Sequence, residues 1–161
     1  MIVLVQVMQF ATPFGWPLSV AVVDGSVVSS GFVRIGNLPI PPGAGDVVRV
    51  VDTGVAACVR DWLGGEPDAL SRVPVSQPGS PFRQAVWDQM RSIPGGSTST
   101  YGQIAAMAGH ARAARAVGAA CASNRVAPFV PCHRVVPSAG GIGRYAYGSA
   151  LKSALLEFEA G

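Results

Sequence analysis

Charged residues are scarce in this chain, because only 13% of its 161 residues are Asp, Glu, Lys or Arg, and Lys152 is the single lysine. A hydrophobic share of 49% suits a folded protein with a sizeable core and excludes a disordered chain. The apolar runs stay well short of the ~20 residues needed to cross a bilayer. No basic leader precedes them, so we expect neither a signal peptide nor a membrane contact, and a cytoplasmic protein.

Cysteine and histidine are also few. The three cysteines, Cys58, Cys121 and Cys132, share no CxxC spacing, and an odd number of them argues against a disulfide framework. With only His110 and His133 available, the chain lacks the usual ligands of a zinc site. We therefore predict no cofactor and no metal, and we interpret Cys58 and Cys121 as small apolar core residues.

Charge is distributed unevenly between the two halves. Residues 1–79 contain four Arg against six acids, whereas residues 80–161 contain seven Arg and one Lys against three acids. A basic second half indicates an anionic partner, and nucleic acid is the leading candidate.

The first 75 residues read as an α/β domain with strands, turns and one helix. Residues 18–23 and 26–33 are β-rich runs separated by Asp24-Gly25, a hairpin turn signal. Residues 47–63 are expected to form a helix that ends at Gly64-Gly65. One face of this helix would carry Val51, Val55, Cys58, Val59 and Trp62.

The second half, residues 80–161, reads as a helical domain. Ser80-Pro81 is a helix start with a capping residue, and Thr100 with Gln103 matches a capping box. The helix that follows Thr100 is stopped by Gly109, and residues 112–122 form the next helix. Two helices joined by a tight glycine turn are typical of a helix-turn-helix.

The second of these helices is built mainly from Ala and Gly, with Arg112 and Arg115 near its start. Two interpretations are open. It is either an Ala-rich core helix with two solvated arginines, or a bare helix that approaches DNA closely. In the second case we expect backbone contacts and little sequence specificity.

The segment 130–136 contains the thiol of Cys132 beside the imidazole of His133 and the guanidinium of Arg134. A neighbouring base or cation lowers a thiol pKa, and the thiolate is the nucleophile. The alternative is a buried cysteine with a coincidental histidine. Adjacent side chains on an extended backbone also point apart, so proton transfer would need a turn or a bridging water.

The motif Pro131-Cys132-His133-Arg134-Val135 resembles the active-site motif of the O6-alkylguanine-DNA alkyltransferases, also called methylated-DNA–protein-cysteine methyltransferases. Further segments resemble this family in the same order, and the similarity spans roughly residues 80–160. They are residues 82–87, 100–105, 113–118 and 143–145, then Asn124 and Glu159.

The resemblance implies a fold and an activity. The fold is α/β, with a small RNase H-like antiparallel sheet and a helix in residues 1–75, followed by a winged-helix or helix-turn-helix domain in residues 80–161. The activity is DNA repair by irreversible transfer of an alkyl group from O6-alkylguanine to Cys132, once per molecule. The partner is double-stranded DNA that contains the lesion, bound by a monomer that can cluster on DNA.

The resemblance also assigns the chemistry. Cys132 is the nucleophile, Glu159 orients His133, and His133 takes the thiol proton through a water. Asn124 forms the turn that stabilises the active-site loop. These four residues are the predicted catalytic set.

Other residues are implied to hold the DNA and the extruded base. Tyr101 helps to turn out the nucleotide, and Arg115 fills the vacated space, while Ala114 and Gly118 let their helix sit in the minor groove. The remaining pocket residues are Val135, Tyr145, Ala146 and Tyr147.

Two positions depart from the family pattern Tyr-Ser-Gly-Gly, because this chain has Tyr145-Ala146-Tyr147-Gly148. Without the serine hydroxyl, any contact to O6 must come from the backbone amide of Ala146. The ring of Tyr147 is expected to narrow the pocket, so that methyl adducts react well and benzyl adducts poorly.

Three other functions remain as alternatives. A Cys-His hydrolase would need an orienting group and an oxyanion hole, and it would leave Arg115 unexplained. A protein that recognises the lesion without repairing it would lack the cysteine, which is present here. A transcriptional regulator would need a further promoter-binding unit.

Overall fold

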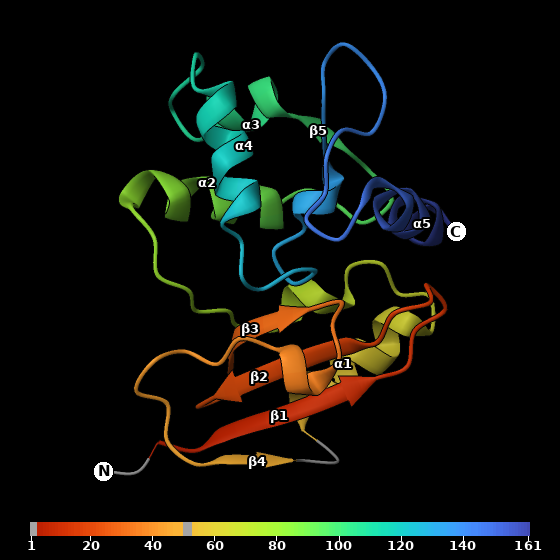
Figure 1. Cartoon of the computed structure of the whole chain (residues 1–161). Coiled ribbons are helices and arrows are strands. Elements are labelled where there is room, and N and C mark those ends of the chain that lie inside the picture. The colour runs from red at the N-terminus through yellow and green to blue at the C-terminus, as the bar shows by residue number, and fades with distance from the viewer. Residues whose placement is uncertain (1–2, 50–52) are drawn as a thin grey trace. The chain divides into compact units, whose positions relative to one another are not determined.

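The computed structural model describes residues 3–49 and 53–161 (Figure 1). The chain divides into two compact units. The first unit comprises Met1–Gln77 together with Arg125–Phe129, and the second comprises Pro78–Asn124 together with Val130–Gly161.

The first unit contains a four-stranded sheet in the order β3-β2-β1-β4. Strands β1, β2 and β3 are antiparallel neighbours, but β4 pairs with β1 in parallel. The sheet is therefore mixed, and the expectation of a purely antiparallel sheet is wrong for this edge strand. The strands are β1 (Val5–Phe10), β2 (Leu18–Val23), β3 (Ser26–Gly31) and β4 (Val47–Arg49).

The hairpin between β2 and β3 is confirmed. Asp24 and Gly25 have φ angles of 49° and 81°, so both lie in the left-handed region. That pair of conformations defines the two-residue hairpin turns whose twist matches the flanking strands. Glycine adopts this region without steric cost, which explains its place here.

The helix of the first unit is shorter than the sequence predicts. It is α1 (Gly54–Leu63), and the side chain of Thr53 caps it by accepting a hydrogen bond from the Ala56 amide at 3.2 Å. Residues 47–49 instead form β4, because their β-branched valines suit a pleated strand. Val51, expected on the buried helix face, lies outside the described residues. The buried residues of α1 are Val55, Ala56, Val59 and Trp62.

A short segment from the second half of the sequence belongs to the first unit. The Ser30 amide donates to the Arg125 carbonyl at 2.9 Å, and the Ser30 hydroxyl donates to the Ala127 carbonyl at 2.7 Å. The side-chain oxygen of Gln77 accepts from the Arg125 amide at 2.8 Å. Residues 125–129, which the sequence places in the second domain, are thus held against β3.

The second unit is mainly helical. Its α2 begins where expected, with the Ser80 hydroxyl accepting from the Arg83 amide, and α3 begins with the predicted capping box between Thr100 and Gln103. Gly109, with a φ of 86°, ends the turn after α3. The helices are α2 (Pro81–Arg91), α3 (Tyr101–Met107), α4 (Ala114–Ala122) and α5 (Ser149–Ala160).

The helix-turn-helix pair α3 and α4 is confirmed, although α4 begins at Ala114 and leaves Arg112 in the preceding turn. The pair packs on α2, where the indole nitrogen of Trp87 donates to the Ala120 carbonyl at 2.9 Å. The core residues that these helices contribute have no exposed surface. They are Val86, Met90, Ile104, Ala105, Val117 and Ala120.

Two short parallel strands complete the second unit. In β5 (Ser99–Thr100) and β6 (Val135–Val136), Ser99 pairs with Val135 and Thr100 pairs with Val136. This pairing holds the start of α3 beside the segment that follows Cys132. The α/β class of the chain is confirmed, and no helix in residues 3–49 or 53–161 is long and apolar enough to span a membrane.

Replacing Ser80 with alanine removes the cap of α2 and leaves a helix amide without its partner. We expect the free energy of unfolding to fall by about 1 kcal/mol, measured by urea denaturation. Ser80→Asp should retain the cap. Ser97→Ala, at an exposed position outside any helix, serves as the control, and an equal loss in that variant would contradict the assignment.

Candidate active site

A tight turn positions the predicted nucleophile. Residues Cys132–Arg134 form a single 3₁₀ turn, in which the Arg134 amide donates to the Pro131 carbonyl at 2.9 Å. The preceding Cys132 amide donates to the Val130 carbonyl at 2.9 Å. The backbone here is therefore not extended, and the divergence expected for adjacent side chains on a strand does not apply.

One carboxylate organises the residues after the nucleophile. The Glu159 side chain, near the end of α5, lies 2.6 Å from the Nε2 atom of His133. The same carboxylate accepts two hydrogen bonds from the Arg134 guanidinium, at 3.0 and 2.5 Å. A third guanidinium nitrogen donates to the Ile93 carbonyl at 2.8 Å. All three ionisable side chains are buried, so each needs the partners it has.

The protonation states follow from this arrangement. Burial alone would raise the pKa of Glu159, but the hydrogen bonds from His133 and Arg134 lower it to about 2. Burial lowers the pKa of His133 below its ordinary value of 6.5, which outweighs the opposing effect of Glu159. At neutral pH the pair is thus a carboxylate and a neutral imidazole that donates from Nε2. The Nδ1 atom is buried and has no hydrogen-bond partner among the described residues.

The Cys132 thiol is 5% exposed and faces Asn124. The Asn124 amide nitrogen lies 3.4 Å from the sulfur and donates to the Val130 carbonyl at 2.9 Å. Burial raises the pKa of the Cys132 thiol, whereas the hydrogen bond from Asn124 and the charge of Lys152 lower it. Arg134, whose charge the sequence placed beside the thiol, is instead paired with Glu159.

Lys152 is fully buried on α5. Its ammonium group donates to the Val135 carbonyl at 2.6 Å and to the Arg144 carbonyl at 3.1 Å. The lysine therefore ties α5 to the segment after the nucleophile and to the loop before α5.

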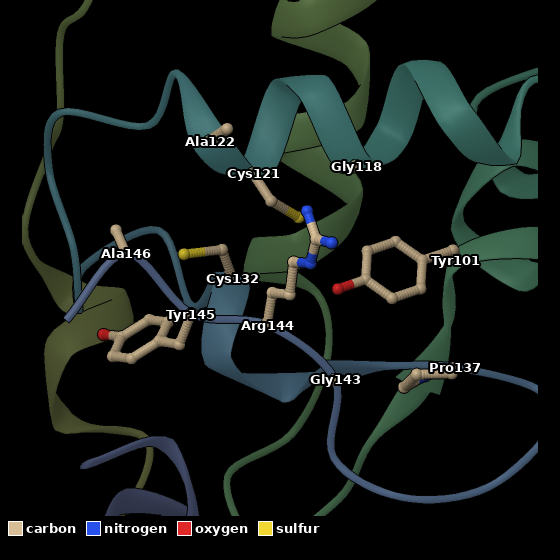
Figure 2. A pocket seen from close by; sticks show the side chains of 10 residues that line it. All are labelled: Tyr101, Gly118, Cys121, Ala122, Cys132, Pro137, Gly143, Arg144, Tyr145 and Ala146. Atoms are coloured by element: carbon tan, nitrogen blue, oxygen red, sulfur yellow. The ribbon is translucent and has the colours of Figure 1, made fainter. Parts of the chain in front are cut away.

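A cavity of about 820 Å³ opens over the thiol (Figure 2). Gly118 of α4 lies on its wall, and a side chain there would meet no atom within 4 Å, so protein packing does not require this glycine. The absence of a side chain at this position keeps the cavity open. The lining residues are Tyr101, Gly118, Cys121, Ala122, Cys132, Pro137, Gly143, Arg144, Tyr145 and Ala146.

Three of the five residues expected to bind the base line this cavity, namely Tyr101, Tyr145 and Ala146. Val135 does not, since its side chain is fully buried. Tyr147 is not among the lining residues either, and its ring packs against that of Tyr145 with centroids 5.5 Å apart. The narrowing of the pocket that we expect from Tyr147 stays a prediction.

The Tyr145 hydroxyl is buried and has no hydrogen-bond partner in the described part of the chain. Burial raises the pKa of Tyr145 well above its ordinary value, so this group remains a protonated donor. A buried donor without a partner is costly in a folded protein and indicates a place where a ligand atom completes the bonding.

The exposed face of α4 carries one long side chain and several short ones. Arg115 is exposed, as are Ala116, Ala119 and Ala122, whereas Ala114 is half-buried. Gly118, expected on the DNA side, also lines the cavity. The face is thus smooth apart from Arg115, as a helix that approaches another surface closely requires.

Sequence reasoning missed three residues of the site. Cys121, interpreted as a core residue, is half-buried and lines the cavity with Cys132. Arg144 also lines the cavity, and Lys152 supports this wall by donating to the Arg144 carbonyl. The helical spacing of Gly118, Cys121 and Ala122 was the available signal, because residues three and four apart share one face of a helix.

These features define a helix-turn-helix protein with a buried, hydrogen-bonded cysteine at the base of a cavity. Residues 81–161 match the model of the 6-O-methylguanine DNA methyltransferase DNA-binding domain. A methylated-DNA–protein-cysteine methyltransferase of Shigella flexneri is 40% identical over 106 residues, covering 66% of this chain and 62% of that protein. The match thus spans less than two thirds of that relative.

Solved structures extend the similarity to nearly the whole chain. A variant of the Mycobacterium tuberculosis O6-methylguanine methyltransferase superposes with a TM-score of 0.78 at 32% identity, covering 97% of this chain and 93% of that one. A Mycobacterium tuberculosis relative in complex with DNA gives a TM-score of 0.76, also at 32% identity, covering 96% and 92%. The chain belongs to the O6-methylguanine-DNA methyltransferase family.

Replacing Glu159 with glutamine leaves the buried Arg134 guanidinium without a countercharge. We expect the free energy of unfolding to fall by about 3–5 kcal/mol. The carboxylate contributes stability above its ordinary pKa of 4.5, and this contribution is lost as pH falls toward about 2. Urea denaturation between pH 7 and pH 2 should therefore show a smaller pH dependence in the variant.

Glu157→Gln is the matched control, because Glu157 lies on the same helix but is exposed. Its unfolding curve should stay close to that of the unmodified chain at every pH. If Glu157→Gln and Glu159→Gln behaved alike, the carboxylate of Glu159 would not be the organising group.

Proposed function

We propose that this protein repairs DNA by transferring an alkyl group from O6-alkylguanine to its own Cys132, one group per molecule. The observation that carries the proposal is the buried thiol of Cys132 beside the His133–Glu159 pair, at the base of a cavity in a helix-turn-helix unit. Family membership gives the reaction class. The hydrolase alternative would leave the smooth face of α4 and its Arg115 without a role.

The thiol proton has one available acceptor in the site. Glu159 holds the proton of His133 on Nε2, so Nδ1 is free to accept. We infer that Nδ1 takes the Cys132 proton through a water, which leaves a thiolate stabilised by the Asn124 amide and by the charge of Lys152. The buried carboxylate stabilises the imidazolium that forms.

The transfer is an in-line displacement. A sulfur lone pair of Cys132 forms the bond to the alkyl carbon while the bond from that carbon to O6 breaks, and its electron pair moves to the guanine. The guanine anion then gains a proton, so the products are guanine and an S-alkyl cysteine. The thioether offers no leaving group that would restore the thiol, which makes the protein a single-turnover reagent.

The substrate base must leave the duplex, because a target atom inside the stack is out of reach of a buried thiol. We infer that Tyr101, at the cavity wall, helps to turn the nucleotide out. Arg115 on the exposed face of α4 fills the space that the base vacates, and the short side chains beside it let the helix enter the minor groove. Binding should depend on salt and little on sequence.

Double-stranded DNA that contains O6-alkylguanine is therefore the proposed partner. The structural relative in complex with DNA supports this assignment. We expect the protein to act as a monomer in solution and to be able to cluster along DNA.

Incubation with an oligonucleotide that contains O6-methylguanine should add one methyl group, about 14 Da, to the intact protein. Peptide mapping should locate the group on Cys132, and the gain should saturate at one per molecule. The free thiol in the same cavity supplies the matched control. Cys121→Ser should still gain the methyl group, and Cys132→Ser should not.

Two results would overturn this proposal. Methylation of Cys121 in the unmodified chain would place the nucleophile elsewhere. Binding of the damaged strand with no mass gain would leave a lesion-recognition protein with an unreactive thiol.

Replacing Arg115 with alanine should slow methyl transfer from duplex DNA by about 100-fold, because the vacated space in the stack stays empty. Transfer from a single-stranded oligonucleotide should change little, since no stack has to be opened. Arg112→Ala is the control, because Arg112 is exposed but precedes α4. Arg112→Ala should weaken DNA binding in a salt-dependent way, and it should not affect the duplex more than the single strand. If Arg115→Ala slowed methyl transfer equally from duplex and single-stranded DNA, Arg115 would not fill the space left by the base.

A further inference from the structure

Arg144 is the one charged side chain among the residues that line the cavity. Figure 2 shows its guanidinium pointing into the cavity between Cys121 and Tyr101, with the Cys132 thiol close by. The space it borders is the space that an extruded base must enter to reach the thiol.

The guanidinium of Arg144 is chemically available. Within residues 3–49 and 53–161 it has neither an ion pair nor a hydrogen-bond partner. The other two cations of the site are already engaged, because Arg134 is bound to Glu159 and Lys152 to two carbonyl groups. Among the described residues that line the cavity, Arg144 is therefore the one charged donor that a ligand can use.

The backbone on both sides of Arg144 is fixed. Its carbonyl accepts from the buried Lys152 ammonium at 3.1 Å. Gly143 before it has a φ of 77°, and a side chain there would approach Pro137 to 3.0 Å, so glycine is needed for the loop to turn. The hydroxyl of Tyr145, the next residue, is buried. The backbone at Arg144 is therefore constrained, and Figure 2 shows its side chain pointing into the cavity.

We propose that Arg144 recognises the extruded guanine by donating to the N7 and O6 atoms of its edge. The inference rests on the proposed function, since it names the substrate contact of that same site. A guanidinium presents two parallel donors, and guanine presents two adjacent acceptors at N7 and O6. Adenine offers a donor at the corresponding position, and O4-methylthymine lacks the N7 acceptor.

The same contact assists the reaction. As the bond from the alkyl carbon to O6 breaks, negative charge develops on the guanine, and a cation already in place stabilises it. Position 146 is alanine, so no side-chain hydroxyl there shares this task. The charged guanidinium of Arg144 thus replaces the neutral hydroxyl donor that a serine at position 146 would supply.

A phosphate contact is the competing role for an arginine in a DNA-binding protein. The position of Arg144 favours the base, because its guanidinium lies within the cavity beside Cys121 (Figure 2). Arg144 and Arg115 are both exposed, but Arg144 lines the cavity, whereas Arg115 lies on the exposed face of α4 and is not among the lining residues.

The test compares the unmodified chain with Arg144→Met on two duplexes, one with O6-methylguanine and one with O6-methyl-7-deazaguanine, in which a C–H group replaces N7. Single-turnover rates are measured at saturating DNA. We expect Arg144→Met to slow transfer from O6-methylguanine by about 100-fold. The deaza substitution should slow the unmodified chain by about 10-fold and leave the variant's rate unchanged.

Arg144→Lys retains the charge without the paired donors. It should recover part of the transfer rate, but its rate should not depend on whether N7 is present. The preference for O6-methylguanine over O4-methylthymine should fall in both Arg144→Met and Arg144→Lys. Arg112→Met controls for the loss of an arginine outside the cavity. Thermal unfolding curves that match the unmodified chain verify that each variant is folded.

Three results would overturn the inference. Weaker DNA binding with an unchanged saturating rate would make Arg144 a phosphate contact. Faster transfer by Arg144→Met would make the side chain an obstacle in the cavity. If the deaza substitution slowed the unmodified chain and Arg144→Met by the same factor, Arg144 would not contact N7. Failure of the unmodified chain to gain a methyl group would instead refute the proposed function, which keeps the two failures distinct.

Discussion

The bond network around the Glu159 carboxylate is the interaction on which the site depends. It joins the end of α5 to His133 and Arg134, which lie 26 and 25 residues earlier in the chain. A buried carboxylate is costly unless paired, and here two donors and a full countercharge satisfy it. The same contacts fix the imidazole tautomer of His133, the turn that carries Cys132, and the position of α5.

A second buried cation extends this frame to the cavity. Lys152 on the same helix binds the carbonyl groups of Val135 and Arg144, so α5 holds both the strand after the nucleophile and the loop at the cavity wall. Because Lys152 binds the backbone of the loop, the side chains of the loop remain available to line the cavity. Among the positive charges of the second unit, Arg134 and Lys152 have structural roles, whereas Arg115 and Arg144 are among those that a ligand can reach.

Local patterns predicted the elements that local forces determine. The Asp24-Gly25 hairpin, the Ser80 cap and the capping box at Thr100 depend on hydrogen bonds and backbone conformations within a few residues. The helix expected from residue 47 was too long, because pairing with β1 is a long-range interaction that a helical pattern does not reveal. The same limit explains why local patterns give no sign that residues 125–129 pack with the first unit.

The sequence by itself determined the family and proposed Cys132 as the nucleophile, since both depend on residue types at fixed spacing around Cys132. Tertiary structure alone decided which side chains line the cavity with the Cys132 thiol. Arg134 adjoins Cys132 in sequence but is bound to Glu159, whereas Cys121 and Arg144 are distant in sequence and line the cavity. The physical reason is burial, because the fold allows a charge in the interior only where partners from other segments meet it.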